Sequence, residues 1–127
     1  IPLKAVAAQF ETIREIGKKG SAVIVGRCAD YVLKDQENVL TVFIYADMKY
    51  RIDRVAQRNG ISREEAEKRI KITDKNRAAY YNYYTDRNWG KSQNYHLSID
   101  SGYFGIENSV VLLEACINNM ENPGGSF

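Results

Sequence analysis

Two short, uninterrupted apolar runs lie between segments of helical periodicity, and this alternation constrains the fold more than any other feature. Residues 21–25 read SAVIV and residues 39–45 read VLTVFIY, and both runs are rich in β-branched side chains. Continuous apolar runs of this length are typical of strands that a parallel sheet buries on both faces. The alternating stretch at 95–100, YHLSID, predicts a third strand. Short strands alternating with helices predict an α/β fold with a parallel sheet.

Three strands are few for a parallel sheet that is buried on both faces. Either the sheet is unusually small, or part of the domain is absent from this chain. The 127 residues contain no internal repeat and no linker, so we expect a single domain over residues 1–127. The ending ENPGGSF has turn chemistry without a core face, which predicts a frayed tail at about 120–127.

Apolar side chains at steps of three and four predict helices in the remaining segments. Asp47 is the expected cap of one helix, and Asn59-Gly60 breaks that helix. The tetrapeptide SREE at 62–65 predicts a capping box, in which the Ser hydroxyl and the Glu carboxylate satisfy each other's free N–H groups. The expected helices cover residues 3–19, 29–33, the segment between Asp47 and Asn59, residues 62–86 and residues 106–118.

Composition and charge exclude several classes of protein. Hydrophobic residues make up 44% of the chain and charged residues 27%, as in ordinary soluble globular domains. The net charge of +2 is too weak to indicate a nucleic-acid polymer as partner. No apolar run approaches the ~18 residues of a membrane span, so no membrane contact is expected. Cys28 and Cys116 have no metal-ligand spacing; reduced cysteines in the cytoplasm are expected, and an intramolecular disulfide is the alternative.

The tripeptide Gly90-Lys91-Ser92 has the ending of a phosphate-binding loop. The full fingerprint also needs a Gly separated from the Gly-Lys pair by four residues, and Thr85 stands at that position. A phosphate loop follows a buried strand and opens a helix, whereas here a helical pattern comes first and a strand pattern follows. The tripeptide is therefore expected to be an ordinary helix-to-strand loop.

Arginines gather where the predicted sheet would present a ligand, because open parallel sheets place ligands beyond the carboxyl ends of their strands. Arg27 and Asp30 follow the first predicted strand. Arg51, Arg54 and Arg58 form one stripe on the helix after the second strand, beside its apolar stripe. Guanidinium groups suit bidentate phosphate contacts, which favours a phosphate-binding site. A solvated helix face is the alternative interpretation of this stripe.

Arg77 lies in the middle of an apolar stripe on the next helix. A buried, unpaired charge is very costly, so Arg77 must be paired or must face a ligand. Asp74, at the edge of the stripe, can pair with Arg77, which would be a purely structural explanation. Alternatively, several guanidinium groups over the strand ends suit phosphoryl transfer, which neutralises spreading charge on several sides. The apolar or aromatic members of the stripe are Ala66, Ile70, Tyr81 and Tyr84.

Residues 21–117 resemble the cytidylate-kinase-like family of P-loop kinases, relatives of the nucleoside monophosphate kinases. The matching segments, in order, are SAVIVGRCADYVL, VFIYADMKYRIDRVAQRNGISREEAEKRI, TDKNRAAYYNYYT, WG and YHLSIDSGYFGIENSV. The resemblance implies a three-layer P-loop kinase-like fold with a parallel sheet, and a mobile helical lid over the donor triphosphate at about 51–77. It implies that Arg27 helps to hold the acceptor nucleoside monophosphate, and that Asp74 and Arg77 contact the nucleotide.

The chain departs from the family pattern in two places. The family's phosphate loop belongs to an N-terminal strand–loop–helix, and nothing before residue 21 matches it. Val25 and Cys28 stand where cytidylate kinases carry Asp, before the Gly and after the Arg of the GR motif, and Asp30 is the candidate replacement. The tyrosine-rich stretch 80–84 is expected to pack, with a homodimer interface as one place for it.

The favoured hypothesis is a cytosolic phosphotransferase that moves the γ-phosphoryl of ATP, with Mg²⁺, to a nucleoside monophosphate or another small acceptor. CMP is the first candidate acceptor. A non-catalytic or degenerate nucleotide- or phosphate-binding module is the alternative. Without a phosphate loop, this chain is expected to be inactive alone. The candidate catalytic residues are Arg54, Arg58, Asp74 and Arg77. The candidate substrate-binding residues are Arg27, Asp30 and Arg51, and no metal ligand is expected.

Overall fold

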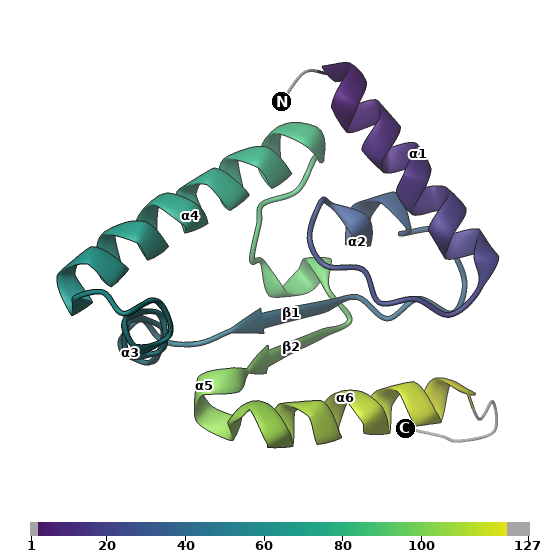
Figure 1. The fold of residues 1–127 in the computed structure, drawn as a ribbon. Helices are drawn as coiled ribbons and strands as arrows, with labels where there is room; N and C mark the ends of the chain where they lie inside the picture. Colours follow the sequence, from purple (N-terminus) through teal and green to yellow (C-terminus); the bar gives the residue numbers. More distant parts are fainter. Residues whose placement is uncertain (1–2, 122–127) are drawn as a thin grey trace.

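Helices make up most of the structure, a computed structural model that describes residues 3–121 (Figure 1). The helices are α1 (Leu3–Lys19), α2 (Ala29–Val32), α3 (Met48–Asn59), α4 (Arg63–Tyr84), α5 (Ser101–Phe104) and α6 (Ile106–Glu121). A 3₁₀ turn, η1 (Ser92–Asn94), precedes the second strand. All the expected helices form, and a further short helix, α5, directly follows the second strand. The expected tail at 120–127 lies mostly outside the described residues.

Two strands form the sheet, β1 (Val42–Tyr45) and β2 (Leu97–Asp100), and they run parallel. Val42 pairs with Leu97, and the register continues to Tyr45 opposite Asp100. The two strands are therefore 55 residues apart in the sequence along their whole length. The prediction of a three-stranded sheet in a three-layer α/β fold is wrong for this chain, since the described residues are mostly helical and carry only these two strands.

Residues 21–25, predicted to be a buried strand, form no helix and pair with no strand in the part of the chain that the structure describes. Ile24 packs against the core formed by Ile13, Ala29 and Leu33. Val23 and Val25 point the other way, and their exposed fractions are 93% and 86%. The alternation is that of a strand, but a strand also needs a neighbouring backbone to satisfy its N–H and C=O groups. Segment 21–25 has no such neighbour among the described residues.

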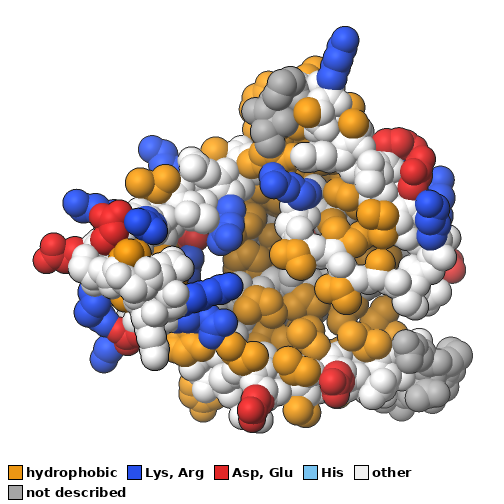
Figure 2. Space-filling model, viewed as in Figure 1, with side chains coloured by type: hydrophobic (Ala, Val, Ile, Leu, Met, Phe, Trp, Pro, Cys, Tyr) orange, Lys and Arg blue, Asp and Glu red, His pale blue; other side chains and the backbone are white. Residues whose placement is uncertain are grey.

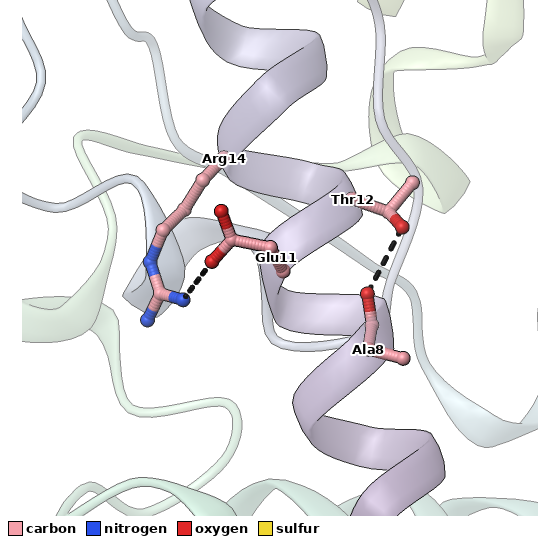
Figure 3. A network of polar contacts seen from close by, with 4 residues as sticks. All are labelled: Ala8, Glu11, Thr12 and Arg14. Carbon is pink, nitrogen blue, oxygen red and sulfur yellow. Dashed lines mark hydrogen bonds and ion pairs between the residues drawn. The ribbon is translucent and has the colours of Figure 1, made fainter.

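The N-terminal helix α1 packs against α2, which begins four residues after segment 21–25. Its outer face is polar and makes contacts within the helix (Figure 3). Arg14 pairs with Glu11 at 3.3 Å, and the Thr12 hydroxyl donates to the Ala8 carbonyl at 2.9 Å. Such exposed contacts add little stability, so the apolar face of α1 is what holds it in place.

Helices α3 and α4 form a hairpin with a core of its own, in which Ile52 packs against Ala66 and Ile70. The Asp47 carboxylate accepts from the Tyr50 N–H at 2.8 Å, which confirms the expected cap of α3. Gly60 follows α3 with a φ of 63°, a left-handed conformation that glycine adopts without steric cost. Residues at the helix ends thus set where α3 begins and ends, and an apolar stripe from each helix packs the two together.

The cap of α4 forms only in part as predicted. The Ser62 hydroxyl accepts from the Glu65 N–H at 3.1 Å. The Glu65 carboxylate, however, accepts from Arg69 at 3.2 Å, one turn further along the helix. The hydroxyl half of the predicted capping box is present, and a side-chain pair along α4 replaces the carboxylate half.

Tyrosines anchor the carboxyl end of α4 to the N-terminal part of the chain. The Tyr80 hydroxyl donates to Gln9 of α1 at 3.1 Å. The Tyr81 hydroxyl donates to Asp30 of α2 at 2.7 Å, and Tyr81 is buried. This end of α4 is therefore hydrogen-bonded to α1 and α2, while its amino end lies in the hairpin with α3.

The segment with the Gly-Lys-Ser tripeptide is a loop between α4 and β2, as expected. Trp89 meets Phe43 of β1 edge-on, with 5.5 Å between the ring centroids. Gly90 has a φ of 80°, and a Cβ at this position would lie 3.4 Å from the Phe43 ring. The glycine therefore allows the chain to turn closely over β1, and the tripeptide leads into the short turn η1.

Candidate functional site

A cavity of about 560 Å³ opens at the carboxyl end of β1. Tyr45 and Ala46 lie in its wall where β1 ends, and Ser101 contributes from the end of β2. Figure 2 shows the hollow, with basic side chains on its left rim and hydrophobic side chains along its floor. The apolar lining comes mainly from the sheet, the loop before β2 and helix α6, through Phe43, Ile44, Trp89, Ile106, Val110 and Leu113.

The charged wall of this cavity comes from the hairpin of α3 and α4. Four of the predicted catalytic and substrate-binding residues line it: Arg51, Arg54, Asp74 and Arg77. They lie on one side because positions 51 and 54 are one turn apart on α3, and positions 74 and 77 are one turn apart on α4. The cavity therefore brings together three guanidinium groups and one carboxylate.

Asp74 pairs with Arg51 across the hairpin, and not with Arg77 on its own helix. The two terminal nitrogens of Arg51 donate to the two carboxylate oxygens of Asp74 at 2.8 Å and 2.6 Å. This bidentate hydrogen bond raises the pKa of Arg51 above its ordinary value. The expected contact along α4 is replaced because α3 lies close enough for a fork-to-fork pair, which is the stronger geometry.

Arg54 and Arg77 are exposed and form no ion pair with any described residue. Arg77 is thus not the desolvated, carboxylate-paired arginine that one interpretation of the sequence expected, since its stripe borders an open cavity. Two unpaired guanidinium groups beside a third that is held by a carboxylate give the wall a net positive charge. Such a wall attracts anions with several oxygen atoms, and phosphates above all.

The remaining candidate residues lie outside the lining of this cavity. Arg58 is on the exposed surface of α3. Arg27 is exposed, and both Arg27 and Cys28 adopt φ values near +60°, which non-glycine residues seldom do. Asp30 accepts the hydrogen bond from Tyr81 and borders a second, smaller cavity of about 190 Å³.

Burial changes the chemistry of two groups near Asp30. Burial first, and the negative charge of Asp30 second, raise the pKa of the Cys28 thiol to about 11. Burial and the hydrogen bond to Asp30 raise the pKa of Tyr81 above its ordinary value. Both groups stay protonated at neutral pH, so neither supplies a nucleophile or a general base there.

Comparison with known proteins identifies the relatives of this chain. A family model described as the cytidylate kinase-like family matches residues 2–103. The chain belongs to the cytidylate kinase-like family. The resemblance inferred from the sequence segments is therefore confirmed.

Two relatives within this family come from archaea. Cytidylate kinase of Pyrococcus horikoshii is 33% identical over 112 residues, which cover 87% of this chain and 56% of the relative. Cytidylate kinase of Thermococcus kodakarensis is 33% identical over 111 residues, with the same two coverages. The chain thus spans just over half the length of the curated relatives that it matches.

A solved structure has the same fold as this member of the cytidylate kinase-like family. The crystal structure of an uncharacterized protein from Eubacterium ventriosum superimposes with a TM-score of 0.88 and shares 33% sequence identity. The match covers 93% of this chain and 68% of that protein. The arrangement of helices around two parallel strands therefore recurs in a longer protein.

The carboxylates at or near this cavity are poorly placed to bind magnesium. Mg²⁺ prefers oxygen ligands in octahedral geometry. Both oxygens of Asp74 are taken by Arg51, and Asp100 caps α5 by accepting from the Gly102 and Tyr103 N–H groups at 3.1 Å. The described residues contain no group of three acidic, His or Cys side chains that could hold an ion. A magnesium ion at this cavity would have to be held mainly by the phosphates of a bound nucleotide.

The sequence interpretation missed several residues that line the cavity. Ser101 follows β2 directly, so the rule that ligands gather at the carboxyl ends of parallel strands could have found it. Ser109 is buried, and its hydroxyl donates to the Gly105 carbonyl at 2.7 Å. No local signal marks Ser109, because only the packing of α6 brings it to the cavity wall.

Within residues 3–121, no helix has both the length and the apolar character that crossing a lipid bilayer requires.

Proposed function

We propose that the complete protein transfers the γ-phosphoryl group of ATP to a nucleoside monophosphate, with CMP as the first candidate acceptor. The observation that carries the proposal is the wall of the cavity, where Arg54 and Arg77 are unpaired beside the Arg51–Asp74 pair. Membership of the cytidylate kinase-like family and the names of the archaeal relatives support the same reaction.

The arginines would act by electrostatic stabilisation. Negative charge spreads over the oxygens of a phosphoryl group during transfer, and guanidinium groups fixed around it lower the energy of that state. Arg54 and Arg77 can each offer up to five N–H donors, because no described side chain uses them. ATP supplies the transferred group, and Mg²⁺ bound to its phosphates neutralises part of their charge.

The hairpin of α3 and α4 would be the lid of the enzyme, corresponding to the segment expected at about 51–77. It carries all the arginines that line the cavity, and its core of Ile52, Ala66 and Ile70 allows it to move as one body. Closure of such a lid would bring the guanidinium groups to the phosphates and exclude water.

The loop that holds the donor phosphates would come from a part of the complete protein outside this chain. Gly90-Lys91-Ser92 turns closely over the Phe43 ring and does not open a helix of the kind that a phosphate loop needs. The relatives are longer, since the chain spans 56% of their length. Activity is therefore proposed for the full-length protein, and a cytosolic location and a homodimer remain predictions.

A panel of nucleotides tests the proposal on the full-length protein. Purified protein is mixed with ATP, Mg²⁺ and each of CMP, UMP, AMP and GMP, and formation of diphosphate and ADP is measured. We expect ATP-dependent phosphorylation that is fastest with one pyrimidine monophosphate. If no monophosphate is phosphorylated and none binds, the proposal is wrong.

A non-catalytic nucleotide- or phosphate-binding module is the second candidate function. The specific observation in its favour concerns Asp30, the candidate replacement for the two Asp residues that cytidylate kinases carry beside the GR motif. Asp30 accepts a hydrogen bond from Tyr81 and lies outside the arginine-lined cavity, so it is not placed to contact a nucleotide bound there. Calorimetric binding of CMP or ATP to the full-length protein without any turnover would support this module against the kinase.

A further inference from the structure

Two ion pairs join α3 to α4, and they differ in where they lie. Arg51 and Asp74 form a pair on the cavity wall, with side-chain exposures of 29% and 24%. Asp53 and Arg63 form the other pair outside the cavity lining, with exposures of 52% and 57%. The exposed pair can do little more than hold the hairpin together. The first pair also determines what one wall of the cavity presents.

The geometry of the first pair leaves part of the Arg51 guanidinium available. The two terminal nitrogens each donate one N–H to Asp74, and Nε takes no part in the pair. A guanidinium has five N–H donors, so Nε–H and the outer N–H groups remain free of Asp74. Nε–H and the neighbouring outer N–H together form a second fork, which matches two oxygens of a phosphate.

Asp74 itself has little left to offer a ligand. Both of its carboxylate oxygens accept from Arg51 at short distances, and its side chain is three-quarters buried. A carboxylate also repels a phosphate, so direct contact with a phosphate does not explain why Asp74 lies on this wall.

We propose that Asp74 is a positioning residue: it fixes the guanidinium of Arg51 so that the free fork of Arg51 faces phosphate oxygens in the cavity. The proposal rests on the proposed function of this cavity as a phosphate site. It differs from the role implied by family resemblance, in which Asp74 contacts the nucleotide itself. An arginine that is already oriented loses less conformational freedom when it binds, and a misplacement of about 1 Å can cost about 100-fold in rate.

The charge-neutral variant Asp74→Asn separates positioning from mere charge. Loss of a negative charge alone would strengthen the binding of an anion, whereas loss of positioning weakens it. Asp53→Asn is the matched control, because it removes the other pair between the same helices without touching the cavity lining. Both variants are made in the full-length protein, and binding of inorganic pyrophosphate is measured by calorimetry together with kcat and KM for CMP.

We expect Asp74→Asn to weaken pyrophosphate binding and to lower kcat/KM by about 10- to 100-fold, mainly through kcat. Asp53→Asn should leave pyrophosphate affinity and kcat/KM within about twofold of the wild-type values, because an exposed ion pair contributes little. Unchanged or tighter pyrophosphate binding by Asp74→Asn would overturn the proposal, because Asp74 would then be only a competing charge. Equal losses in the two variants would also overturn it, because the pair would serve only to hold the hairpin.

A measurement without any ligand keeps this inference separate from the proposed function. The ¹⁵N NMR signal of Arg51 Nε, assigned by its loss in Arg51→Lys, should report a guanidinium that rotates slowly in the wild type and in Asp53→Asn. Fast rotation is expected in Asp74→Asn. If Arg51 is equally mobile in all three proteins, Asp74 does not position it. If wild-type protein binds neither pyrophosphate nor nucleotides, the proposed function fails, while this NMR comparison still decides whether Asp74 holds Arg51.

Discussion

At the scale of single residues, the arginines of the α3–α4 hairpin differ in whether they line the cavity. Arg54 and Arg77 line the cavity, whereas Arg58, one turn after Arg54 on α3, lies outside it. All three are exposed, so none of them contributes much to the packing of the hairpin. Substitution of each by Ala therefore separates a role at the cavity from a role in folding.

We expect Arg54→Ala and Arg77→Ala each to lower kcat/KM of the full-length protein by about 100-fold, the scale of one lost fixed donor. Arg58→Ala is the matched control and should stay within about twofold. The free energy of unfolding should change by less than about 0.5 kcal/mol in all three variants. Steady-state kinetics and chemical denaturation measure both quantities. A large loss of stability with normal kinetics in Arg54→Ala or Arg77→Ala would show that the arginine is structural.

Cys28 gives the protein a dependence on alkaline pH. The pKa of its thiol is about 11 in the folded protein, against about 9 for the unfolded chain. Between these values the unfolded state loses the proton and the folded state keeps it, so a rise in pH favours unfolding. We expect the free energy of unfolding to be almost independent of this thiol well below pH 9, and to fall by about 2 kcal/mol between pH 9 and 11.

Denaturation of wild type and Cys28→Ala across this range measures the loss of stability that depends on the thiol. Tyr81, whose pKa is also raised, contributes to the alkaline loss in both proteins and therefore cancels in the comparison. Parallel stability curves for the two proteins between pH 9 and 11 would contradict the prediction.

At the scale of elements, the hairpin of α3 and α4 is built from local signals. Asp47 caps α3, Gly60 ends it in a left-handed conformation, and Ser62 caps α4. The stripe of Ile52, Ala66 and Ile70 then closes the two helices on each other. The hairpin is the element that carries the charged cavity wall, so its helix ends set the positions of the arginines.

The cap of α4 is testable by substitution at Ser62. Ser62→Ala removes the acceptor of the Glu65 N–H and should lower the free energy of unfolding by about 1 kcal/mol. Ser62→Asp is the control, since a carboxylate at this position accepts the same bond and should retain most of the stability. Chemical denaturation of the three proteins measures the effect. Equal losses in both variants would mean that the cap is not what Ser62 contributes.

At the scale of the whole molecule, several apolar side chains are left uncovered by the described residues. Val23 and Val25 are almost fully exposed, and Ile44 and Tyr45 of β1 are each exposed by nearly half. Parallel sheets are normally covered on both faces, and exposed apolar patches of this kind mark interaction surfaces. The relatives and the solved structure are longer than this chain. We therefore expect the rest of the complete protein to cover Val23 and Val25.

Val23→Asp and Ile72→Asp, compared in the full-length protein, test this expectation. Val23→Asp should lower the free energy of unfolding by about 3 kcal/mol, because it would bury an unpaired carboxylate. Ile72→Asp, on the exposed side of α4 with an exposed fraction of 61%, should change it by less than about 0.5 kcal/mol. If Val23→Asp is as mild as Ile72→Asp, Val23 remains exposed in the complete protein.

The sequence by itself determined five of the six helices within residues 3–121, the cap of α3, and the stripe of arginines on that helix. These features depend on neighbours within a few residues, such as the Asp47 carboxylate and the Tyr50 N–H, so local spacing predicts them. The family resemblance also followed from segments that the sequence carries in order. The loop at Gly90, in contrast, needed a distant residue, Phe43, to explain its close turn.

The tertiary structure decided which apolar run becomes a strand and which arginine Asp74 holds. Residues 42–45 pair because β2 lies beside them, while the equally apolar residues 21–25 have no neighbouring backbone among the described residues. Asp74 pairs with Arg51, which is 23 residues away in the sequence, and not with Arg77, which is three residues away. Both outcomes depend on groups brought together by packing, because a hydrogen bond forms with whatever donor lies within about 3 Å, whatever its distance along the chain.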